Sequence, residues 1–466
     1  MKVYNSLSKR VEEFIPHGDV VTMYTCGPTV YHYAHIGNLR TYIFEDILER
    51  TLLFLGYKVK RVMNITDIGH LEGDSDTGED KMVKSAREEK KTVKEIADFY
   101  TKAFLKDIEK LNIKVPEIME PASENIDTYL KIISTLIDKG YAYFNHNVYF
   151  DMEKAKDFLN YEYLVGVRKS NIKQDEVTDN YKKNPEDFAL WFTDSKFKNQ
   201  EMKWDSPWGY GYPGWHIECS GISLENLGEY LDIHCGGVDN IFPHHANEIL
   251  QSEAYLGHPW CKYFIHGEHL NLKDFKMSKS LGNVLTLSKL EEEGYSPLDY
   301  RFFVLNSHYR KVLSFDFDKL DAAKNKLKSL REEINYLKEG KIDNEKVEPY
   351  IEKFKDALAS DLNTSLAITT LYNTLKDNSL SQADKYYLVS KYDEVLKLDL
   401  IRKHDLDEEL IKEVESLIEE RNKYKKEGLY DKADEIRENL KNKGFILKDG
   451  RDKTTYQYIG GINEKE

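Results

Sequence analysis

The chain contains little cysteine and no long apolar run. Only 4 of its 466 residues are cysteine, too few for the disulfide scaffold of a small secreted protein. No stretch approaches the roughly 20 consecutive apolar residues that a membrane-spanning helix needs. No apolar run follows the basic residues at the N-terminus, so we expect no secretory signal. These absences predict a cytoplasmic protein without a membrane segment, whose reduced thiols bind metals or react.

The composition also lacks the marks of a disordered or fibrous chain. Hydrophobic residues make up 40% and charged residues 32%, as in ordinary globular proteins. The net charge of −15 argues against a nonspecific nucleic-acid coat. Between positions 421 and 453, however, eleven Lys or Arg accompany seven Asp or Glu. This basic stretch is where we expect phosphate contacts, although such an excess is also typical of a solvated surface.

The first 66 residues have the pattern of a nucleotide-binding sheet. Residues 20–24 form a short apolar run that predicts a buried strand. Residues 38–55 carry apolar side chains at helical spacing, and Gly56 is typical of a helix end. Residues 57–66 then predict a second strand. Strand, loop, helix and strand in this order open a doubly wound α/β sheet, in which ligands bind at the carboxyl ends of the strands.

The later segments differ in composition and periodicity from the first 66 residues. Residues 114–203 are rich in Tyr, Asn, Asp and Lys and predict an insertion between two halves of the sheet. Within it, residues 142–144 and 148–150 predict a hairpin around Asn145-His146-Asn147. Beyond Phe317 the pattern is helix after helix, which favours a bundle. From about Glu408 we expect two more helices and a short strand-like end.

One pair of residues has the spacing of a metal site. His244 and Glu248 follow Pro243, which favours a helix start, and residues four apart share a helix face. An imidazole and a carboxylate can then point at one ion. The same pattern is also common on solvated helix faces.

Two cysteines are candidates to complete such a site. Cys26 ends the first predicted strand, and Cys219 lies in Trp-His-Ile-Glu-Cys-Ser. Two cysteines with a histidine and a carboxylate suit the tetrahedral preference of zinc. A lone buried cysteine is more often a small hydrophobic residue, and no spacing rule joins residues so far apart. Cys235 and Cys261 compete as ligands and are taken as structural.

Two short motifs indicate a nucleotide site. His35-Ile-Gly-Asn38 precedes the first long helix, where free N–H groups and the helix dipole attract phosphate. The side chains of His35 and Asn38 add donors that can stabilise charge on a reacting phosphate. Lys276-Met277-Ser278-Lys279-Ser280 is a basic loop whose lysines can clamp a triphosphate. The alternative is an ordinary surface loop. The presence of both motifs in one chain, however, argues against a chance match.

These motifs resemble the "HIGH" and "KMSKS" signatures of class I aminoacyl-tRNA synthetases, and the nearest likeness is to the cysteinyl-tRNA synthetase family. The likeness covers almost the whole chain. Four further strings carry it: Thr-Cys-Gly-Pro-Thr-Val-Tyr from Thr25, Pro-Gly-Trp-His-Ile-Glu-Cys-Ser from Pro213, Gly-Val-Asp-Asn-Ile-Phe-Pro-His-His-Ala-Asn-Glu from Gly237, and Ala-Asp-Glu-Ile-Arg-Glu-Asn-Leu from Ala433.

The resemblance implies a Rossmann-type doubly wound parallel sheet split by a connective insertion, with an α-helical bundle and a small anticodon-binding domain after it. The implied segments are residues 1–113 and 204–265 for the two catalytic halves, 114–203 for the insertion, 266–317 for a stem-contact fold with the lysine loop, 318–407 for the bundle and 408–466 for the anticodon-binding domain.

The resemblance also implies roles for individual residues. One zinc ion is expected on Cys26, Cys219, His244 and Glu248. The cysteine pocket is expected to include Thr66, Trp215, His234 and Asp239. ATP, with Mg²⁺, is expected to contact His35, Gly37, Asn38, Lys276, Met277, Ser278 and Lys279. The catalytic groups among these are expected to be His35, Asn38, Lys276 and Lys279, with Lys279 the principal lysine.

The chain departs from the family pattern at three places. Asn38 stands for the second histidine of "HIGH", an exchange that the family tolerates. An acidic, glycine-rich insertion follows Asp67, and Cys235 stands where a glycine is expected.

The implied activity is ligation of cysteine to tRNA(Cys) through a cysteinyl-adenylate, by a monomer without an editing domain. Zinc would select the substrate because it binds thiolate readily and a neutral hydroxyl poorly. Two alternatives remain: a ligase that joins cysteine to an amino sugar, which would have no use for the basic C-terminal stretch, and a zinc-stabilised tRNA-binding paralogue without chemistry.

Overall fold

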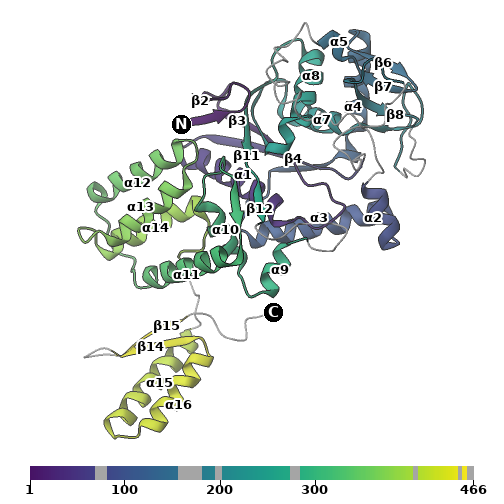
Figure 1. Cartoon of the computed structure of the whole chain (residues 1–466). Helices are drawn as coiled ribbons and strands as arrows, with labels where there is room; N and C mark the ends of the chain where they lie inside the picture. Colours follow the sequence, from purple (N-terminus) through teal and green to yellow (C-terminus); the bar gives the residue numbers. More distant parts are fainter. Residues whose placement is uncertain are drawn as a thin grey trace. The chain divides into compact units, whose positions relative to one another are not determined.

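The computed structural model describes residues 1–68, 81–155, 181–194, 202–272, 284–401, 408–449 and 454–458. The chain forms two compact units (Figure 1). The first unit comprises Met1–Ser329 and Glu339–Leu398, and the second comprises Leu330–Lys338 and Asp399–Glu466. The lysine loop at Lys276–Ser280 and most of the acidic insertion after Asp67 lie outside the described residues.

A five-stranded parallel sheet, in the order β11-β10-β3-β4-β5, is the centre of the first unit. Its strands are β3 (Val20–Thr25), β4 (Lys58–Ile65), β5 (Ile118–Pro121), β10 (Leu231–Gly237) and β11 (Cys261–Gly267). In chain order this arrangement is 3-2-1-4-5, so the predicted doubly wound sheet is confirmed. The order reverses between β3 and β10, where such folds bind ligands.

Helices bury both faces of this sheet. Met23 and Ile233 pack on one face with α1 (Ile36–Phe54), whereas Tyr24 and Phe264 pack on the other with α7 (Trp215–Leu227) and α8 (His244–Leu256). As predicted, α1 ends just before Gly56, whose φ of +93° suits a residue without a side chain.

The apolar stripe of α1 does not reveal how deeply the helix is buried. Arg40, Glu45, Asp46 and Glu49 lie on its other faces and are also buried. The three carboxylates are paired with basic side chains, as where Glu45 lies 3.0 Å from Arg61, and Arg40 donates to backbone carbonyl oxygens. The helix is therefore surrounded, rather than half-exposed as its periodicity suggests.

An antiparallel sheet in the order β6-β7-β8-β9 lies between β5 and β10 in the chain, which agrees with an insertion. The predicted hairpin is confirmed, because Ala142 pairs with Phe150 and Asn145 with Asn147. The elements of this region are α4 (Ile126–Asp138), β6 (Ala142–Asn145), β7 (Asn147–Phe150), α5 (Met152–Ala155), β8 (Phe188–Phe192) and β9 (Tyr212–Pro213).

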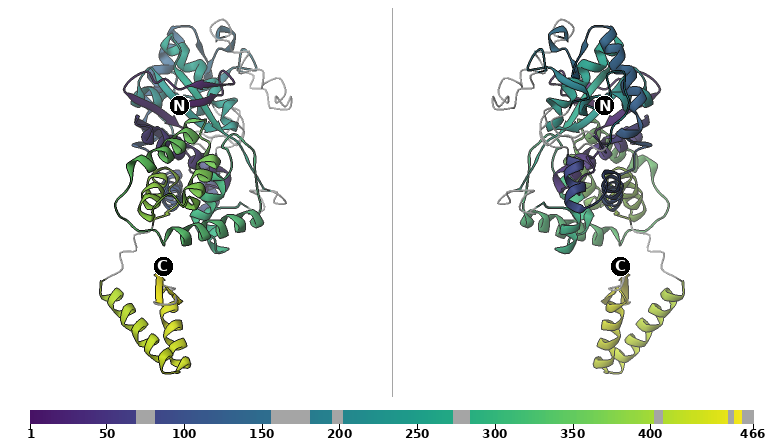
Figure 2. Two further views of the ribbon diagram at one scale, coloured as in Figure 1. Left: turned by 90° about the vertical axis from the view of Figure 1, so that its left-hand side faces the viewer. Right: turned by 90° about the vertical axis from the view of Figure 1, so that its right-hand side faces the viewer.

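Short elements and helices complete the first unit. They are β1 (Lys2–Asn5), β2 (Arg10–Glu13), α2 (Lys81–Glu89), α3 (Val93–Lys110), η1 (Ala122–Glu124), η3 (Val238–Ile241), β12 (Leu270–Leu272), α9 (Leu287–Glu292), α10 (Pro297–Leu305) and β13 (Leu313–Phe315). The predicted run of helices follows in α11 (Phe317–Ile334), whose residues from Leu330 onward belong to the second unit, α12 (Asn344–Ala359), α13 (Thr364–Lys376) and α14 (Gln382–Leu396), drawn in green in Figure 2.

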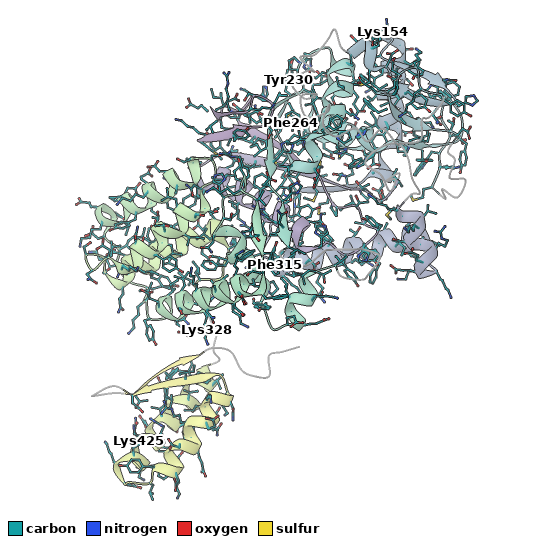
Figure 3. The ribbon with its side chains drawn as sticks, viewed as in Figure 1. Lys154, Tyr230, Phe264, Phe315, Lys328 and Lys425 are labelled. Carbon is teal, nitrogen blue, oxygen red and sulfur yellow. The ribbon has the colours of Figure 1, made fainter. Side chains whose placement is uncertain are left out.

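The second unit contains α15 (Glu408–Lys426), α16 (Tyr430–Asn442) and an antiparallel pair, β14 (Phe445–Asp449) with β15 (Thr454–Tyr458). The strand-like end is thus a hairpin rather than one strand. Arg421 is only 2% exposed and binds Asp449 through both terminal nitrogens, at 2.7 and 2.9 Å. Lys425, labelled in Figure 3, also binds Asp449. Phosphate contacts in this stretch would therefore fall on its other basic residues.

No helix in the described part of the chain is long and apolar enough to cross a membrane. The finer six-segment division predicted above remains a prediction.

Candidate active site

The four predicted zinc ligands converge at the base of the site. Cys26 follows β3, Cys219 lies on α7, and His244 and Glu248 lie one turn apart on α8. One side-chain donor atom from each lies within 4.8 Å of the other three. Pro243 is the N-cap residue of α8 rather than its first helical residue, but His244 and Glu248 still share a face. Residues as far as 222 positions apart in the chain thus form one group, in which all but the partly buried Cys26 are buried.

A second group of ligands overlaps the first. His234 and His245 join Cys26 and Glu248 with the same 4.8 Å limit on their donor atoms. The Nε2 of His234 lies 2.8 Å from Glu248 Oε2, and the Nε2 of His245 lies 3.2 Å from Cys26 Sγ. Two histidines that the sequence did not single out, His245 and His266, are linked in turn by a 2.9 Å contact.

Glu248 and the histidines of this base shift each other's pKa values. Burial alone would lower the pKa of His244, but the carboxylate of Glu248, 3.0 Å away, raises it to about 10. Burial would likewise raise the pKa of Glu248, yet His244 and His234 lower it to about 2. Oε1 of Glu248 is buried and makes no hydrogen bond of good geometry. Two thiols, an imidazole and this underused carboxylate are a donor set that fits zinc.

Neighbouring side chains hold the ligands in place. The indole of Trp215 stacks on His244, with ring centres 4.1 Å apart, and His216 Nδ1 lies 3.0 Å from His244 Nδ1. On the other side, Phe264 (labelled in Figure 3) packs 5.4 Å from the ring of His234. Such outer partners orient metal-binding histidines.

A cavity of about 450 Å³ opens above this base, at the point where the strand order reverses. Its walls include Cys26 and Trp215 from the ligand region and His35, Gly37 and Asn38 from the start of α1. The predicted nucleotide motif and the predicted metal site therefore face one cavity.

The start of α1 is built by a reciprocal cap. Nδ1 of His35 accepts a hydrogen bond from the Asn38 backbone N–H at 3.1 Å, and the His35 N–H donates to Asn38 Oδ1 at 3.3 Å. Because Nδ1 is an acceptor, the proton of a neutral His35 ring is on Nε2. The cap uses the amide oxygen of Asn38 and leaves its NH₂ group as the donor side. Asparagine thus both stabilises the helix start and keeps a donor at the cavity.

The four residues predicted for the cysteine pocket lie in different settings. Trp215 and Asp239 line the cavity. His234 is fully buried beneath it against Glu248, and Thr66 is 2% exposed beside the loop that follows β3. The Asp239 side chain is 79% exposed and lies 3.6 Å from His269.

Asn64 connects the loop that carries Cys26 to Thr66 through hydrogen bonds. Its Oδ1 accepts from the N–H of Gly27 at 2.8 Å, and its Nδ2 donates to Thr66 Oγ1 at 2.9 Å. Gly27 has no room for a side chain, because a Cβ there would lie 1.6 Å from the Asn64 carbonyl oxygen. The loop carrying Cys26 is therefore packed directly on β4.

Cys235 and Cys261 are buried and belong to neither ligand group within the described residues. Cys235 packs with Ile233 in the core on the α1 side of the sheet, whereas Cys261 packs with Leu231 and Trp260 at the start of β11. The four predicted loop contacts Lys276, Met277, Ser278 and Lys279 lie outside the described residues.

Comparison with known proteins agrees with this architecture. The family model described as tRNA synthetases class I (C) catalytic domain matches residues 13–325. A methionyl-tRNA synthetase of Mycobacterium tuberculosis, solved with methionyl-adenylate, has a TM-score of 0.56 at 13% identity, covering 81% of this chain and 90% of its own. A leucyl-tRNA synthetase of Agrobacterium radiobacter in a ternary complex has a TM-score of 0.57 at 11% identity, covering 83% and 84%. Sheet, cavity and family match together define a class I aminoacyl-tRNA synthetase.

Relatives that match over their full length show which family of this class the chain belongs to. The cysteine–tRNA ligase of Treponema denticola is 44% identical over 98% of this chain and 100% of its own length. That of Borrelia hermsii is 44% identical over 97% and 98%. The chain belongs to the cysteine–tRNA ligase family, whose members attach cysteine to tRNA.

Proposed function

We propose that the protein activates cysteine with ATP in the cavity above the buried ligand group and then transfers the cysteinyl group to the terminal adenosine of tRNA(Cys). One observation carries the proposal: the donor atoms of Cys26, Cys219, His244 and Glu248 meet beneath the cavity whose wall holds His35 and Asn38. The donor set supports zinc, and when bound the ion would take the substrate sulfur as a thiolate and discriminate against the hydroxyl of serine.

The protein's own residues provide the rest of the first reaction. A carboxylate oxygen of cysteine attacks the α-phosphorus of Mg²⁺-bound ATP, and the bond to the bridging oxygen breaks to release pyrophosphate. His35 Nε2–H and the Asn38 amide donate to the phosphate oxygens as their charge grows. Lys276 and Lys279, with Met277 and Ser278 of the same loop, hold the leaving pyrophosphate. Preorganised donors of this kind contribute on the order of 3–4 kcal/mol each.

In the second reaction a ribose hydroxyl of the terminal adenosine attacks the carbonyl carbon, AMP leaves with the bonding electrons, and the hydroxyl proton passes to a phosphate oxygen of AMP. Thr66 and Asp239 would belong to the pocket that holds the amino acid. The rings of Trp215 and His234 keep their neighbours His244 and Glu248 in place.

The test is pyrophosphate exchange into ATP, with cysteine and serine in parallel. We expect exchange with cysteine and none above background with serine. A pocket that separated the two only by size would give about a 10- to 200-fold preference. Exchange with neither amino acid would contradict the proposed activity, and equal exchange with both would contradict selection at the sulfur.

A further inference from the structure

Four aromatic rings from two distant segments meet at the edge of the cavity. His32 and Tyr33 lie in the loop after β3, and Phe99 and Tyr100 lie on α3, which packs beside α2 (Figure 1). Tyr100 is the centre: its ring is stacked at 17° on His32 and meets Tyr33 and Phe99 edge to face, with ring centres 5.9, 5.2 and 5.0 Å away. We call His32, Tyr33, Phe99 and Tyr100 the aromatic platform.

The central ring of the platform is buried, whereas two of its outer rings are exposed. Tyr100 is 7% exposed, and its hydroxyl donates to Glu89. Tyr33 and Phe99, in contrast, are 41% and 43% exposed. Rings serving only as packing between the loop and α3 would be covered on both sides. Two large rings here keep much of their surface in water while the ring beneath holds them in place.

Cations accompany these rings. The Lys91 ammonium lies 4.6 Å from the centre of the Phe99 ring and 2.8 Å from Glu89. Lys94 and Lys102 are exposed on α3. Exposed aromatic rings beside lysines are the combination that proteins use for single-stranded nucleic acid, in which bases stack on rings and phosphates meet cations.

The platform is continuous with the catalytic cavity. His32, Tyr33 and Tyr100 line the same cavity as His35 and Asn38. Tyr42 and Phe104, whose ring centres are 4.9 Å apart, also line this cavity. A strand whose terminal ribose reaches the reacting carbonyl would have its preceding bases near the mouth of this cavity.

We propose that the aromatic platform stacks the unpaired bases next to the terminal adenosine of tRNA and so guides the 3′ end into the cavity. This proposal rests on the proposed function, because it assumes that the terminal hydroxyl reacts there. Stacking is tolerant of base identity, since every base has a π face, and each stacked base contributes about a five- to 150-fold gain in affinity. The platform would thus position the acceptor end without reading its sequence.

The test compares Phe99→Leu, which keeps an apolar side chain but removes the ring, with Phe99→Tyr, which keeps the ring. Phe144→Leu on β6 is a matched control at a 51% exposed phenylalanine outside the platform. For each protein, pyrophosphate exchange with cysteine, the KM for tRNA in aminoacylation, and the Kd for tRNA with and without its unpaired 3′ nucleotides are measured. A melting curve for each confirms folding.

We expect Phe99→Leu to keep normal exchange, to raise the KM for tRNA about tenfold, and to bind the shortened tRNA as the unchanged protein does. Phe99→Tyr and Phe144→Leu should behave like the unchanged protein. An unchanged KM in Phe99→Leu would overturn the platform. A raised KM for ATP in exchange would also overturn it, because the ring would then serve the adenine of ATP. Absence of exchange in the unchanged protein would instead contradict the proposed function itself.

Discussion

Arg301 on α10 donates from Nη2 to Oδ2 of Asp46 on α1 at 2.6 Å, and both side chains are completely buried. The other guanidinium nitrogens of Arg301 donate to the carbonyl oxygens of Leu396 and Leu111, at 2.8 and 3.0 Å. Burial alone would raise the pKa of Asp46, but the charges of Arg301 and Arg50 offset this and lower it. The pair therefore joins the helix that begins at the active site to the helices that follow the sheet.

Arg301→Met should destabilise the protein by about 3 kcal/mol, because it removes the most deeply buried partner of Asp46 and the donor to two carbonyl oxygens, although Arg50 still pairs with Asp46. Urea denaturation would measure the change in free energy of unfolding. Lys110→Met is the matched control, since Lys110 pairs with Glu291 at 2.6 Å but both side chains are about a third exposed; there we expect about 1 kcal/mol or less. Similar losses in the two variants would contradict the role of the buried pair.

Asp107 on α3 should make stability fall as the pH rises. Burial raises the pKa of Asp107 to about 6, above the value near 4 of an unfolded chain. The folded protein thus binds this proton more tightly, and the stabilisation is complete below about pH 4 and is lost as the pH rises through about 6. After allowance for solvent screening, the effect is on the order of 1 kcal/mol.

Asp107→Asn should therefore unfold with the same free energy as the unchanged protein near pH 4 and be more stable near pH 7. Urea denaturation at both values checks this difference. A variant that is less stable at pH 7 would show that the Asp107 carboxylate is stabilised in its charged form.

Cys219→Ala should abolish stoichiometric zinc binding, because it removes one of the two proposed thiol ligands. Cys235→Ala is the control at another completely buried cysteine and should retain one zinc per chain, as measured by atomic absorption after dialysis. His245→Ala discriminates between the two overlapping ligand groups. Zinc kept by Cys219→Ala but lost by His245→Ala would favour the group that contains His234 and His245.

Lys279→Ala should slow cysteine-dependent pyrophosphate exchange about 100- to 1000-fold, as expected for loss of a donor to transition-state charge, without a change in melting temperature. Lys289→Ala, an exposed lysine on α9, should have no effect on exchange. A large loss of stability with activity intact would contradict the proposed role of Lys279.

Removal of the chain from Asp399 onward should leave exchange intact but raise the KM for tRNA, because the basic stretch lies in that part. The measurement is aminoacylation of tRNA at varied tRNA concentration. Product formation unaffected by this truncation would favour a small acceptor such as an amino sugar.

Local signals in the sequence predicted the local structure well. The 3.6-residue periodicity before Gly56 located α1, and the Asn-His-Asn turn located the hairpin, because both depend on neighbours in the chain. The metal group is different. Spacing could join only His244 to Glu248, and family resemblance was needed to add Cys26 and Cys219, since the strand order 3-2-1-4-5 brings them together.

Other features had no usable signal. Asp46 and Arg301 are 255 positions apart, and each looks like an ordinary surface charge in the sequence. Arg421 was counted with the basic stretch, although its guanidinium is buried against Asp449. The rings of the aromatic platform belong to two segments without a recognisable motif. The one sequence signal that would have identified them is the presence of aromatic residues beside the His35 motif.

The bridge from Gly27 through Asn64 to Thr66 fixes the loop that follows β3. At one end Gly27 is packed on β4 without space for a side chain, and at the other Thr66 is held by the same amide. On the proposed function, an amino acid one methylene longer, such as homocysteine, would have to move one of these two ends of the cysteine pocket. The length of the side chain would then be a second criterion of selection, in addition to the chemistry of its sulfur.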